Sequence, residues 1–567
     1  MVVKGKEVKH FLTGNIEAEE IFTPEDFSDE HEMIADLAEK FVMNEVMLSL
    51  EKIENQEFTE TIRLIKEAGD LGLIGADIPE EDGGMDLGKV SGAIISEKMA
   101  YGRSFSITFG GQTGIGALPI AYFGNKEQKE RYLPKLLTGE KIAAYALTEP
   151  SAGTDAMGLK TSAKLTDDGK YYVLNGEKQW ITNSAFADVF IVYAKVDGTQ
   201  ITAFIVEKGY EGLSTSPEEK KMGLKGSSTR SLILDNVKVP AKNVIGEIGR
   251  GHIIAFNVLN IGRYKMASTA LGSSKRSIEL AVKYANERKQ FGNSLSDFNL
   301  IKQKIADMTI RTYANESSVY RTAGAMQNGF EEMKQTGEDY GKTIARFAVE
   351  CSINKVMSTE ALDFVVDEAV QIHGGYGYMA EYEVETIYRD SRINRIFEGT
   401  NEINRIIIAS TLLKKYSGHS ELNQIGNGPL ERAKQTLKLM KDYYEATIQA
   451  IQKAGIDNLN KEQEVAAFLA DLAIGIYRSE SAVLRAEKAF NRSGEEKSSQ
   501  KLDCAKIVVH ETAQQCAIQG LNMAGYLRDD EAFLHAAGRL ISSSTENIVE
   551  TKRRISDRVI AAERYVV

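Results

Sequence analysis

The second half of the chain combines a helical pattern of apolar residues with an almost complete lack of proline. Seven of the eight prolines lie within residues 1–240, and Pro429 is the only later one. Apolar side chains recur three and four positions apart, as in Ile301, Ile305 and Met308, which is the spacing of one helix face. Because proline interrupts helix interiors, this pattern predicts long helices over the C-terminal half.

Between residues 141 and 246 the apolar positions instead form short runs rich in Ile, Val, Phe and Tyr. The runs at 189–196 and 201–206 flank Asp197-Gly198, an arrangement that is typical of a β-hairpin. A further β-branched run covers residues 231–239. These runs predict a β-domain.

Two more short runs, at residues 171–174 and 178–182, flank Asn175-Gly176. Asn-Gly is a strong hairpin signal, because both residues tolerate the positive φ angles that a tight turn requires. We therefore expect a second hairpin here.

Helical periodicity is also present near the N-terminus, at residues 26–48 and 58–73, with Thr23-Pro24-Glu25 as the expected helix start. The uncharged window at 104–125 carries five glycines and a proline, which favours a packed helix-and-turn region over a membrane span. No transmembrane segment is predicted.

Turn formers at residues 417–429 interrupt the helical pattern and predict a linker. The predicted fold is therefore α+β and mainly α, with four domains. They are a helical N-terminal domain at 1–140, a small β-barrel or β-sandwich at 141–246, a helical bundle at 247–416 and a helical extension at 417–567.

The composition is that of a folded globular protein, with 43% hydrophobic and 26% charged residues. A net charge of −12 disfavours non-specific binding to nucleic acid. Cys351, Cys504 and Cys516 form no CxxC pair, so we expect neither a disulfide framework nor a metal site. Residues 1–20 have no apolar core, which predicts no signal peptide and a cytoplasmic protein.

Three segments concentrate small, hydroxyl-bearing and aromatic residues. Residues 145–155 crowd hydroxyls around a proline and a glycine, and taken alone they favour a surface turn. Residues 179–183 contain the single tryptophan, Trp180, which by default would be a core residue. Residues 371–377 are rich in glycine, which suits close approach of a ligand to the backbone or, equally, a loop between helices.

A fourth segment, residues 395–403, places Glu398 among apolar neighbours just before a possible helix cap at Thr400. Burial would raise the proton affinity of this carboxylate, which suits a general base. Taken alone, Glu398 is still more typical of an ordinary surface carboxylate.

Taken together and in this order, the segments resemble the acyl-CoA dehydrogenase family over residues 22–416. The resemblance is carried by YALTEPSAGTD from Tyr145, KQWITN from Lys178, KKMGLKGSST from Lys220, ERKQFG from Glu287, QIHGGYG from Gln371 and IFEGTNEINR from Ile396. It implies a helical N-domain, a small β-domain and a helical bundle. FAD would bind between the β-domain and the bundle, against a neighbouring subunit.

The resemblance also implies which residues contact FAD. They are Tyr145, Leu147, Thr148, Trp180 and Thr182 around the flavin, Arg288, Phe291, Gln371, Gly374 and Gly375 at the adenosine and pyrophosphate end across a dimer contact, and Thr400 and Glu402 at a helix start.

The family's catalytic base corresponds to Glu398, which would take an α-proton from a fatty acyl-CoA while the β-hydrogen leaves as hydride. Some members carry the base one residue before the arginine that here is Arg263, but this chain has Gly262 there. Asn260 stands where several relatives have aspartate, a departure that bears on the hydrogen bond to CoA. The expected substrate contacts are Thr154, Asn260, Arg263 and Gly399.

Residues 259–264 and the helical extension resemble the very-long-chain subgroup of the family. That resemblance implies a homodimer, with an extension that can carry a membrane-binding segment. Residues 432–451 are a candidate amphipathic helix, with Lys434, Lys438 and Lys441 on its polar side. The alternative is a helix packed on its own bundle, which the interleaved acidic residues favour.

We therefore expect an FAD-dependent acyl-CoA dehydrogenase for medium to very long straight chains. It would act in fatty acid β-oxidation, in the cytoplasm or at the membrane periphery, with electron-transfer flavoprotein as electron acceptor. The alternatives are an acyl-CoA oxidase, a noncatalytic scaffold protein with the same fold, and a DNA-binding flavoprotein relative. The near-neutral C-terminal unit disfavours the last.

Overall fold

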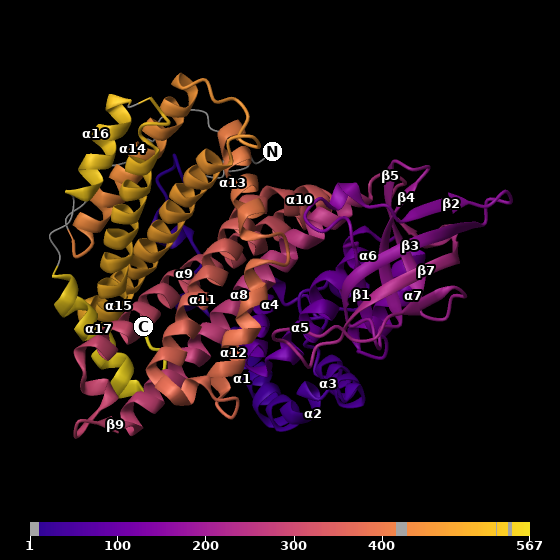
Figure 1. Cartoon of the computed structure of the whole chain (residues 1–567), viewed down its shortest axis with the longest axis horizontal. Coiled ribbons are helices and arrows are strands. Elements are labelled where there is room, and N and C mark those ends of the chain that lie inside the picture. Colours follow the sequence, from indigo (N-terminus) through magenta and orange to yellow (C-terminus); the bar gives the residue numbers. More distant parts are fainter. Residues whose placement is uncertain (1–10, 416–427, 529, 543–546) are drawn as a thin grey trace.

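The computed structural model describes residues 11–415, 428–528, 530–542 and 547–567. The β-domain lies at one end of the molecule, the C-terminal helices lie at the other, and long helices lie between them (Figure 1). The predicted α+β, mainly α fold is confirmed. Most of the linker predicted at 417–429 lies outside the described residues.

The N-terminal region is helical. Its helices are α1 (Asp29–Phe41), α2 (Leu50–Glu54), α3 (Phe58–Asp70), α4 (Gly88–Met99), α5 (Ser104–Gly110), α6 (Leu118–Phe123) and α7 (Lys126–Leu137). The expected helix start was wrong, because Thr23 begins only a 3₁₀ turn, Pro24–Asp26. The cap of α1 is Ser28, whose hydroxyl accepts a hydrogen bond from the His31 N–H at 3.4 Å.

The middle region is a mixed sheet of eight strands. They are β1 (Ala143–Ala146), β2 (Ser162–Leu165), β3 (Tyr171–Thr182), β4 (Val189–Val196), β5 (Gln200–Glu207), β6 (Leu213–Thr215), β7 (Thr229–Pro240) and β8 (Val244–Ile245). The order is β6-β7-β3-β2-β4-β5-β8, and β1 runs parallel to β4 beside it. β4 and β5 form the hairpin predicted around Asp197-Gly198.

The second predicted hairpin is wrong. Asn175 and Gly176 lie inside the single long strand β3, where the register against β7 shifts after Leu174. This is a β-bulge, in which the Asn236 N–H donates to the Asn175 side-chain oxygen at 2.8 Å. Glycine is required because a Cβ at position 176 would lie 2.5 Å from the Thr161 hydroxyl oxygen.

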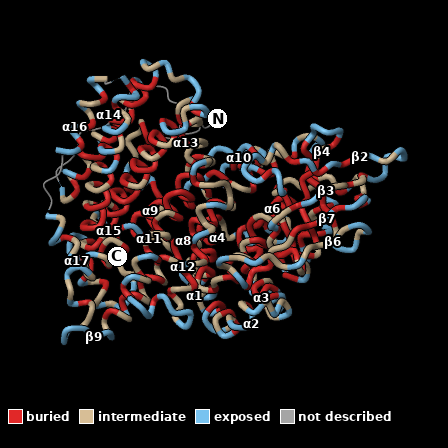
Figure 2. Tube along the Cα trace, viewed as in Figure 1, coloured by how far each residue is buried: buried red, intermediate tan, exposed pale blue. Residues whose placement is uncertain are grey.

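A bundle of helices follows the sheet. Its members are α8 (Gly251–Glu287), α9 (Asn299–Thr336), α10 (Tyr340–Arg346), α11 (Ala348–His373), α12 (Glu383–Ser391) and α13 (Asn401–Lys415), with the small hairpin β9 (Lys289–Gln290) and β10 (Asn293–Ser294) after α8. Figure 2 shows that α8, α9 and α11 are among the most buried segments. Such helices carry apolar residues around most of their circumference.

The C-terminal helices are α14 (Glu431–Lys453), α15 (Gln463–Met523), α16 (Glu531–Ile541) and α17 (Ile548–Ala562). α15 is broken at Gly494, whose φ of +78° is non-helical. α14, α15 and α16 share a core with α11 and α13 that includes Met440, Tyr443, Phe468 and Phe533.

The candidate amphipathic helix at 432–451 is α14, and its apolar face packs on α15 and α16. The placement of Lys441 on the polar side was wrong, because this side chain is buried and its ammonium lies 2.6 Å from a Glu480 carboxylate oxygen. Lys434 pairs with Glu487, and Lys438 is exposed. Within the described ranges, every helix is too short or too polar to cross a membrane.

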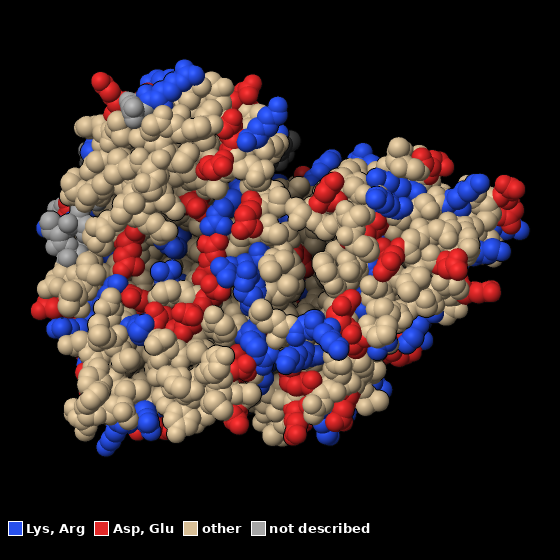
Figure 3. Space-filling model, viewed as in Figure 1, with Lys and Arg blue, Asp and Glu red and all other residues tan. Residues whose placement is uncertain are grey.

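Acidic and basic side chains alternate over the face of the molecule shown in Figure 3. Ion pairs between neighbouring side chains occur at the surface, as between Arg63 and both Glu60 and Glu67. On the face in Figure 3, side chains of opposite charge are therefore neighbours.

Candidate active site

Glu398 lies in a strained turn that leads directly into α13. Its φ is +57° and that of Gly399 is +80°, so two consecutive residues adopt the left-handed region. For a residue other than glycine this conformation costs about 1–3 kcal/mol and is concentrated at functional sites. Thr400 then caps α13, because its hydroxyl accepts from the Ile403 N–H at 3.3 Å.

The Glu398 carboxylate points into the protein, contrary to the ordinary surface carboxylate that its segment alone suggested. Its Oε2 atom is buried and has no hydrogen-bond partner among the described residues. Burial raises the pKa of Glu398 to about 7, against the opposing effect of the Arg263 and Lys355 charges. A carboxylate with this proton affinity is suited to general base catalysis near neutral pH.

Arg263 on α8 holds the main chain of this turn. Its Nε donates to the Glu398 carbonyl oxygen at 3.0 Å, and its Nη1 donates to the Asn260 side-chain oxygen at 2.7 Å. A Cβ at Gly399 would lie 3.4 Å from Arg263 Nη2. Three of the four expected substrate contacts therefore meet beside Glu398, whereas Thr154 is exposed in the loop after β1.

Lys355 on α11 is a second cation at this turn, and the sequence analysis missed it. Its ammonium donates to the Gly399 carbonyl oxygen at 2.8 Å and to the Asn401 side-chain oxygen at 2.7 Å. Burial lowers the pKa of Lys355 to about 7, although the Glu398 charge opposes the shift. The one available signal was a lysine between Ile353 and Val356, which are both buried.

Gly262 provides the space that the Glu398 carboxylate occupies. A Cβ on this α8 residue would lie 2.8 Å from Glu398 Oε2 and 3.3 Å from a side-chain carbon of Ile115. The position therefore cannot carry a larger side chain without moving the carboxylate, in agreement with Glu398 as the one matched base.

The strand residues expected around the flavin lie at the edge of the β-domain. Tyr145 on β1 reaches the bundle, where its hydroxyl donates to the Ala255 carbonyl at 3.4 Å. Burial, with a smaller contribution from the Glu398 charge, raises the pKa of Tyr145 well above its usual value, so this hydroxyl stays neutral. Trp180 has a φ of +59° and is 59% exposed, so its default interpretation as a core residue was wrong. Thr182 ends β3 beside it.

The loop that contains Leu147 and Thr148 is fixed by a buried ion pair that the sequence analysis missed. The Lys178 ammonium lies 2.7 Å from a Glu149 carboxylate oxygen and also donates to the Leu147 carbonyl at 3.1 Å. Burial lowers the pKa of Lys178 to about 8. The segment interpreted as a surface turn is therefore anchored in the domain core.

The residues expected at the adenosine and pyrophosphate end line a separate cavity of about 480 Å³. Arg288, Gln371, Gly374 and Gly375 all contribute to it. Around both glycines, no described atom lies within 4 Å of the place a Cβ would take, so a ligand can approach the backbone closely. Phe291, in the adjacent hairpin, is 93% exposed.

One chain does not bring all the predicted cofactor residues together. The cavity lies beside β9, at the opposite end of the molecule from β1 and β3 in Figure 1. Thr400 and Glu402 lie at the start of α13, beside Glu398.

Family models for acyl-CoA dehydrogenases match the chain in sequence order. The N-terminal domain matches residues 28–140, the middle domain 144–237 and the C-terminal domain 249–413, and a further C-terminal domain model matches 446–531. A probable acyl-CoA dehydrogenase of Bacillus subtilis (strain 168) is 49% identical over 584 residues, which cover 98% of either protein. The chain belongs to the acyl-CoA dehydrogenase family.

Two further relatives of this dehydrogenase bear on its cofactor and its subgroup. The crystal structure of the Bacillus anthracis acyl-CoA dehydrogenase complexed with FAD has a TM-score of 0.94 at 51% identity, covering 99% of this chain and 100% of that one. The human mitochondrial very long-chain specific enzyme is 39% identical over 385 residues, 65% of this chain and 57% of that protein.

The dehydrogenase is an FAD-dependent oxidoreductase, and its residues fit that cofactor. Trp180 offers an exposed aromatic face, and the cavity beside β9 combines a cationic Arg288 with open glycine backbone. A flat ring system and a pyrophosphate require these two kinds of surface.

Proposed function

We propose that this dehydrogenase oxidises medium to very long straight-chain acyl-CoA thioesters to trans-2-enoyl-CoA. The reaction belongs to fatty acid β-oxidation, and the electrons pass to an electron-transfer flavoprotein. The buried Glu398 carboxylate carries the proposal, because its free Oε2 and its pKa of about 7 are the properties that a base for a weak carbon acid needs.

Glu398 removes the proton from the α-carbon of the thioester. The thioester oxygen accepts a hydrogen bond from the Glu398 main-chain N–H, which lowers the energy of the charge that develops there. Arg263 and Lys355 keep this N–H and the carboxylate in fixed relative positions by holding two consecutive carbonyls. When bound, FAD supplies the two-electron acceptor for the β-hydrogen.

FAD in this proposal is held between two copies of the chain. Tyr145, Leu147, Thr148, Trp180, Thr182, Thr400 and Glu402 of one copy surround the flavin, and Arg288, Phe291, Gln371, Gly374 and Gly375 of the second hold the adenosine and pyrophosphate. The separation of β9 from β3 within one chain supports this division, because a single chain offers two incomplete halves (Figure 1). The exposure of Phe291 supports a covering partner at that position.

Two observations support long acyl chains as substrates. Support for long chains comes from the 39% identity to the human very long-chain specific enzyme. The helical segment beside Glu398 also contains Gly110, where no described atom lies within 4 Å of the place a Cβ would take.

An anaerobic titration with saturated acyl-CoAs of increasing length tests the proposal. We expect the visible absorption of bound flavin to bleach stoichiometrically, most readily with medium to very long chains, and to recover on addition of electron-transfer flavoprotein. Rapid recovery in air with stoichiometric peroxide would identify an oxidase instead. Flavin that stays oxidised with every chain length would indicate a noncatalytic scaffold.

A further inference from the structure

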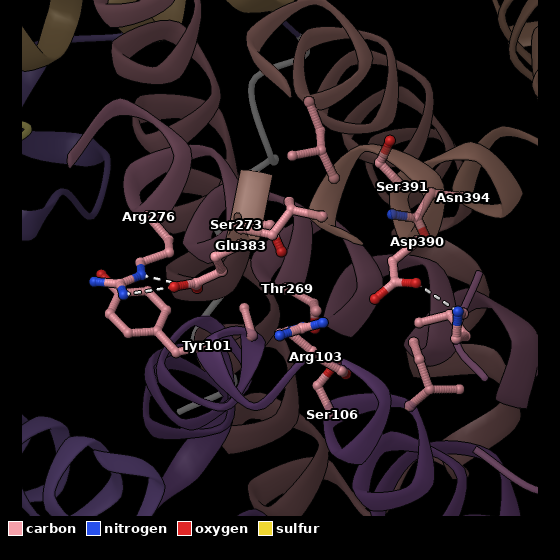
Figure 4. A pocket seen from close by; sticks show the side chains of 15 residues that line it. Tyr101, Arg103, Ser106, Thr269, Ser273, Arg276, Glu383, Asp390, Ser391 and Asn394 are labelled. Atoms are coloured by element: carbon pink, nitrogen blue, oxygen red, sulfur yellow. Dashed lines mark hydrogen bonds and ion pairs between the residues drawn. The ribbon is translucent and has the colours of Figure 1, made fainter. Parts of the chain in front are cut away.

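A small pocket lies between α5, α8, α11 and α12 (Figure 4), and Glu398 is not among the residues that line it. Its volume of about 40 Å³ is enough for a water molecule or one small polar group. The wall is partly apolar, with Ile107, Leu362 and Ile387. Its polar lining includes Arg103, Ser106, Thr269, Ser273, Asp390 and Asn394.

Two of the lining side chains carry buried polar atoms without hydrogen-bond partners in the described parts of the chain. Asp390 is 8% exposed, and its Oδ1 accepts from the Leu224 N–H while its Oδ2 has no partner. The buried Nε–H of Arg103 also lacks a partner. The pocket therefore presents one unused acceptor and one unused donor, and each is costly to bury unpaired.

The remaining charges of the pocket are satisfied. Arg276 donates from Nε and Nη2 to the two Glu383 carboxylate oxygens at 3.0 and 2.8 Å, which the dashed lines in Figure 4 mark. Burial, together with the nearby Glu54 charge, raises the pKa of Asp390 to about 6, so this group is mainly a carboxylate at neutral pH. Its negative charge offsets the positive charge of Arg103.

Arg103 also adopts a strained backbone conformation, with φ of +51°. A residue other than glycine in this region needs surrounding structure to hold it, and such residues cluster at ligand sites. The strain is independent of the unpaired atoms and points to the same position.

The pocket lies on the same side of α8 as Glu398. Thr269 and Ser273 follow Gly262, which abuts the Glu398 carboxylate, by seven and eleven residues. These spacings are about two and three helical turns, so the residues share one face, roughly 10 and 16 Å along the axis.

A second element connects the same two places. The helical segment from α5 onwards has Ile107 in the pocket wall and Ile115 against Gly262. Between them lies Gly110, with open space where a side chain would stand. α8 and this segment therefore both extend from the surroundings of Glu398 to the wall of the pocket.

We propose that this pocket binds a hydroxyl group at the distal end of the acyl chain, which makes hydroxylated acyl-CoAs substrates; the inference rests on the proposed function. A hydroxyl offers a donor for Asp390 Oδ2 and an acceptor for Arg103 Nε. A terminal methyl leaves both atoms unpaired, and a terminal carboxylate would face the Asp390 charge.

The test compares kcat/KM for flavin reduction among acyl-CoAs of equal length that end in a methyl, a hydroxyl or a carboxylate. We expect the hydroxyl-ended substrate to be preferred by about 10-fold or more at the lengths that reach the pocket, and not at shorter lengths. Equal kcat/KM for the methyl and hydroxyl ends at all lengths would overturn the inference alone. Flavin that stays oxidised with every substrate would overturn the proposed function as well.

Two variants locate the effect in the pocket. Arg103→Met removes the donor and should abolish the preference for the hydroxyl end. Asp390→Asn keeps an oxygen for the Leu224 N–H but replaces the free acceptor by a donor, so the preference should move toward the carboxylate end. Arg553 is an exposed arginine on α17. As the control, Arg553→Met should keep the parent ratio of kcat/KM between hydroxyl-ended and methyl-ended substrates. If Arg103→Met folds normally and keeps the parent ratio of kcat/KM between hydroxyl-ended and methyl-ended substrates, the assignment of the pocket is wrong.

Discussion

The Lys355 ammonium donates to the carbonyl oxygen of Gly399 at 2.8 Å, and so holds the residue that follows the proposed base. Arg263 donates to the preceding carbonyl, that of Glu398, at 3.0 Å. Two buried cations from two helices therefore fix consecutive peptide groups of a left-handed turn. Both also favour the ionised form of the Glu398 carboxylate, against the effect of its burial.

Replacement of Lys355 should change the pH dependence of the reaction. Glu398 acts as a carboxylate, so the rate of flavin reduction rises with pH through its pKa of about 7. Lys355→Met removes a charge that lowers this pKa, and the midpoint of the profile should move to higher pH. Lys355→Arg keeps a hydrogen-bond donor and a positive charge at this position, so the midpoint should return to its parent value. Stopped-flow reduction across pH measures the midpoint, and an unshifted midpoint in Lys355→Met would leave Lys355 only a packing role.

Glu398→Gln should retain FAD but slow flavin reduction by about 10²- to 10⁴-fold, because the shape of the pocket is kept and the base is lost. Flavin content and single-turnover reduction of the purified variant check both parts. Glu381 is an exposed glutamate nearby in sequence. In the control variant Glu381→Gln, substrate should reduce the bound flavin at the parent rate. Near-normal reduction by Glu398→Gln would remove Glu398 from the mechanism.

Gly262→Ala should separate activity from stability. The added Cβ would lie 2.8 Å from Glu398 Oε2 and must displace the carboxylate. A displacement of a reacting group by about 1 Å can cost about 100-fold in rate. Alanine is the better helix former by about 1 kcal/mol, so thermal stability should not fall much. Gly538 on α16 has open space at its Cβ position, and Gly538→Ala should leave the rate of flavin reduction unchanged. If Gly262→Ala reduced its flavin at the parent rate, the Glu398 turn would be able to move and accommodate the added methyl group.

Glu398 was predicted as the base from the resemblance of several segments to the family, because its own segment alone favoured an ordinary surface carboxylate. The start of α13 could be predicted from local signals, since the Thr400 cap and the apolar residues around it lie within one short segment. The hairpin at Asp197-Gly198 was correct for the same reason, since its strands pair with each other.

Features that depend on distant partners could not be predicted in this way. Asn175-Gly176 is a good turn sequence, but pairing with β7 on both sides of it holds β3 extended. Lys355 is 43 positions before Glu398 and meets the turn only through the packing of α11 on α13. A helical pattern likewise could not show that Lys441 faces Glu480 on another helix.

Arg288→Ala should weaken FAD retention without a direct chemical defect. Arg288 lines the cavity beside β9, with its guanidinium 5.6 Å from the centre of the Tyr376 ring. Among the described residues that line this cavity it is the one arginine or lysine, and a guanidinium binds phosphate strongly. Flavin content after gel filtration should fall, and saturating FAD should restore activity. Lys289→Ala, which removes the exposed neighbouring charge, is the matched control. Equal flavin occupancy in Arg288→Ala and the parent would argue against the assigned FAD contact.

Lys441→Met should destabilise the protein by about 3 kcal/mol, because the buried Glu480 carboxylate would lose one of its two cation partners. Glu480→Gln should cost more, since it removes the ion-pair partner of both Lys441 and Arg321. Lys438→Met, three positions earlier on the exposed side of α14, should change stability by no more than about 0.5 kcal/mol. Thermal unfolding of the three FAD-loaded variants and the parent ranks these losses of stability. Equal effects of Lys441→Met and Lys438→Met would mean that the buried pair adds nothing to the attachment of α14 to α15.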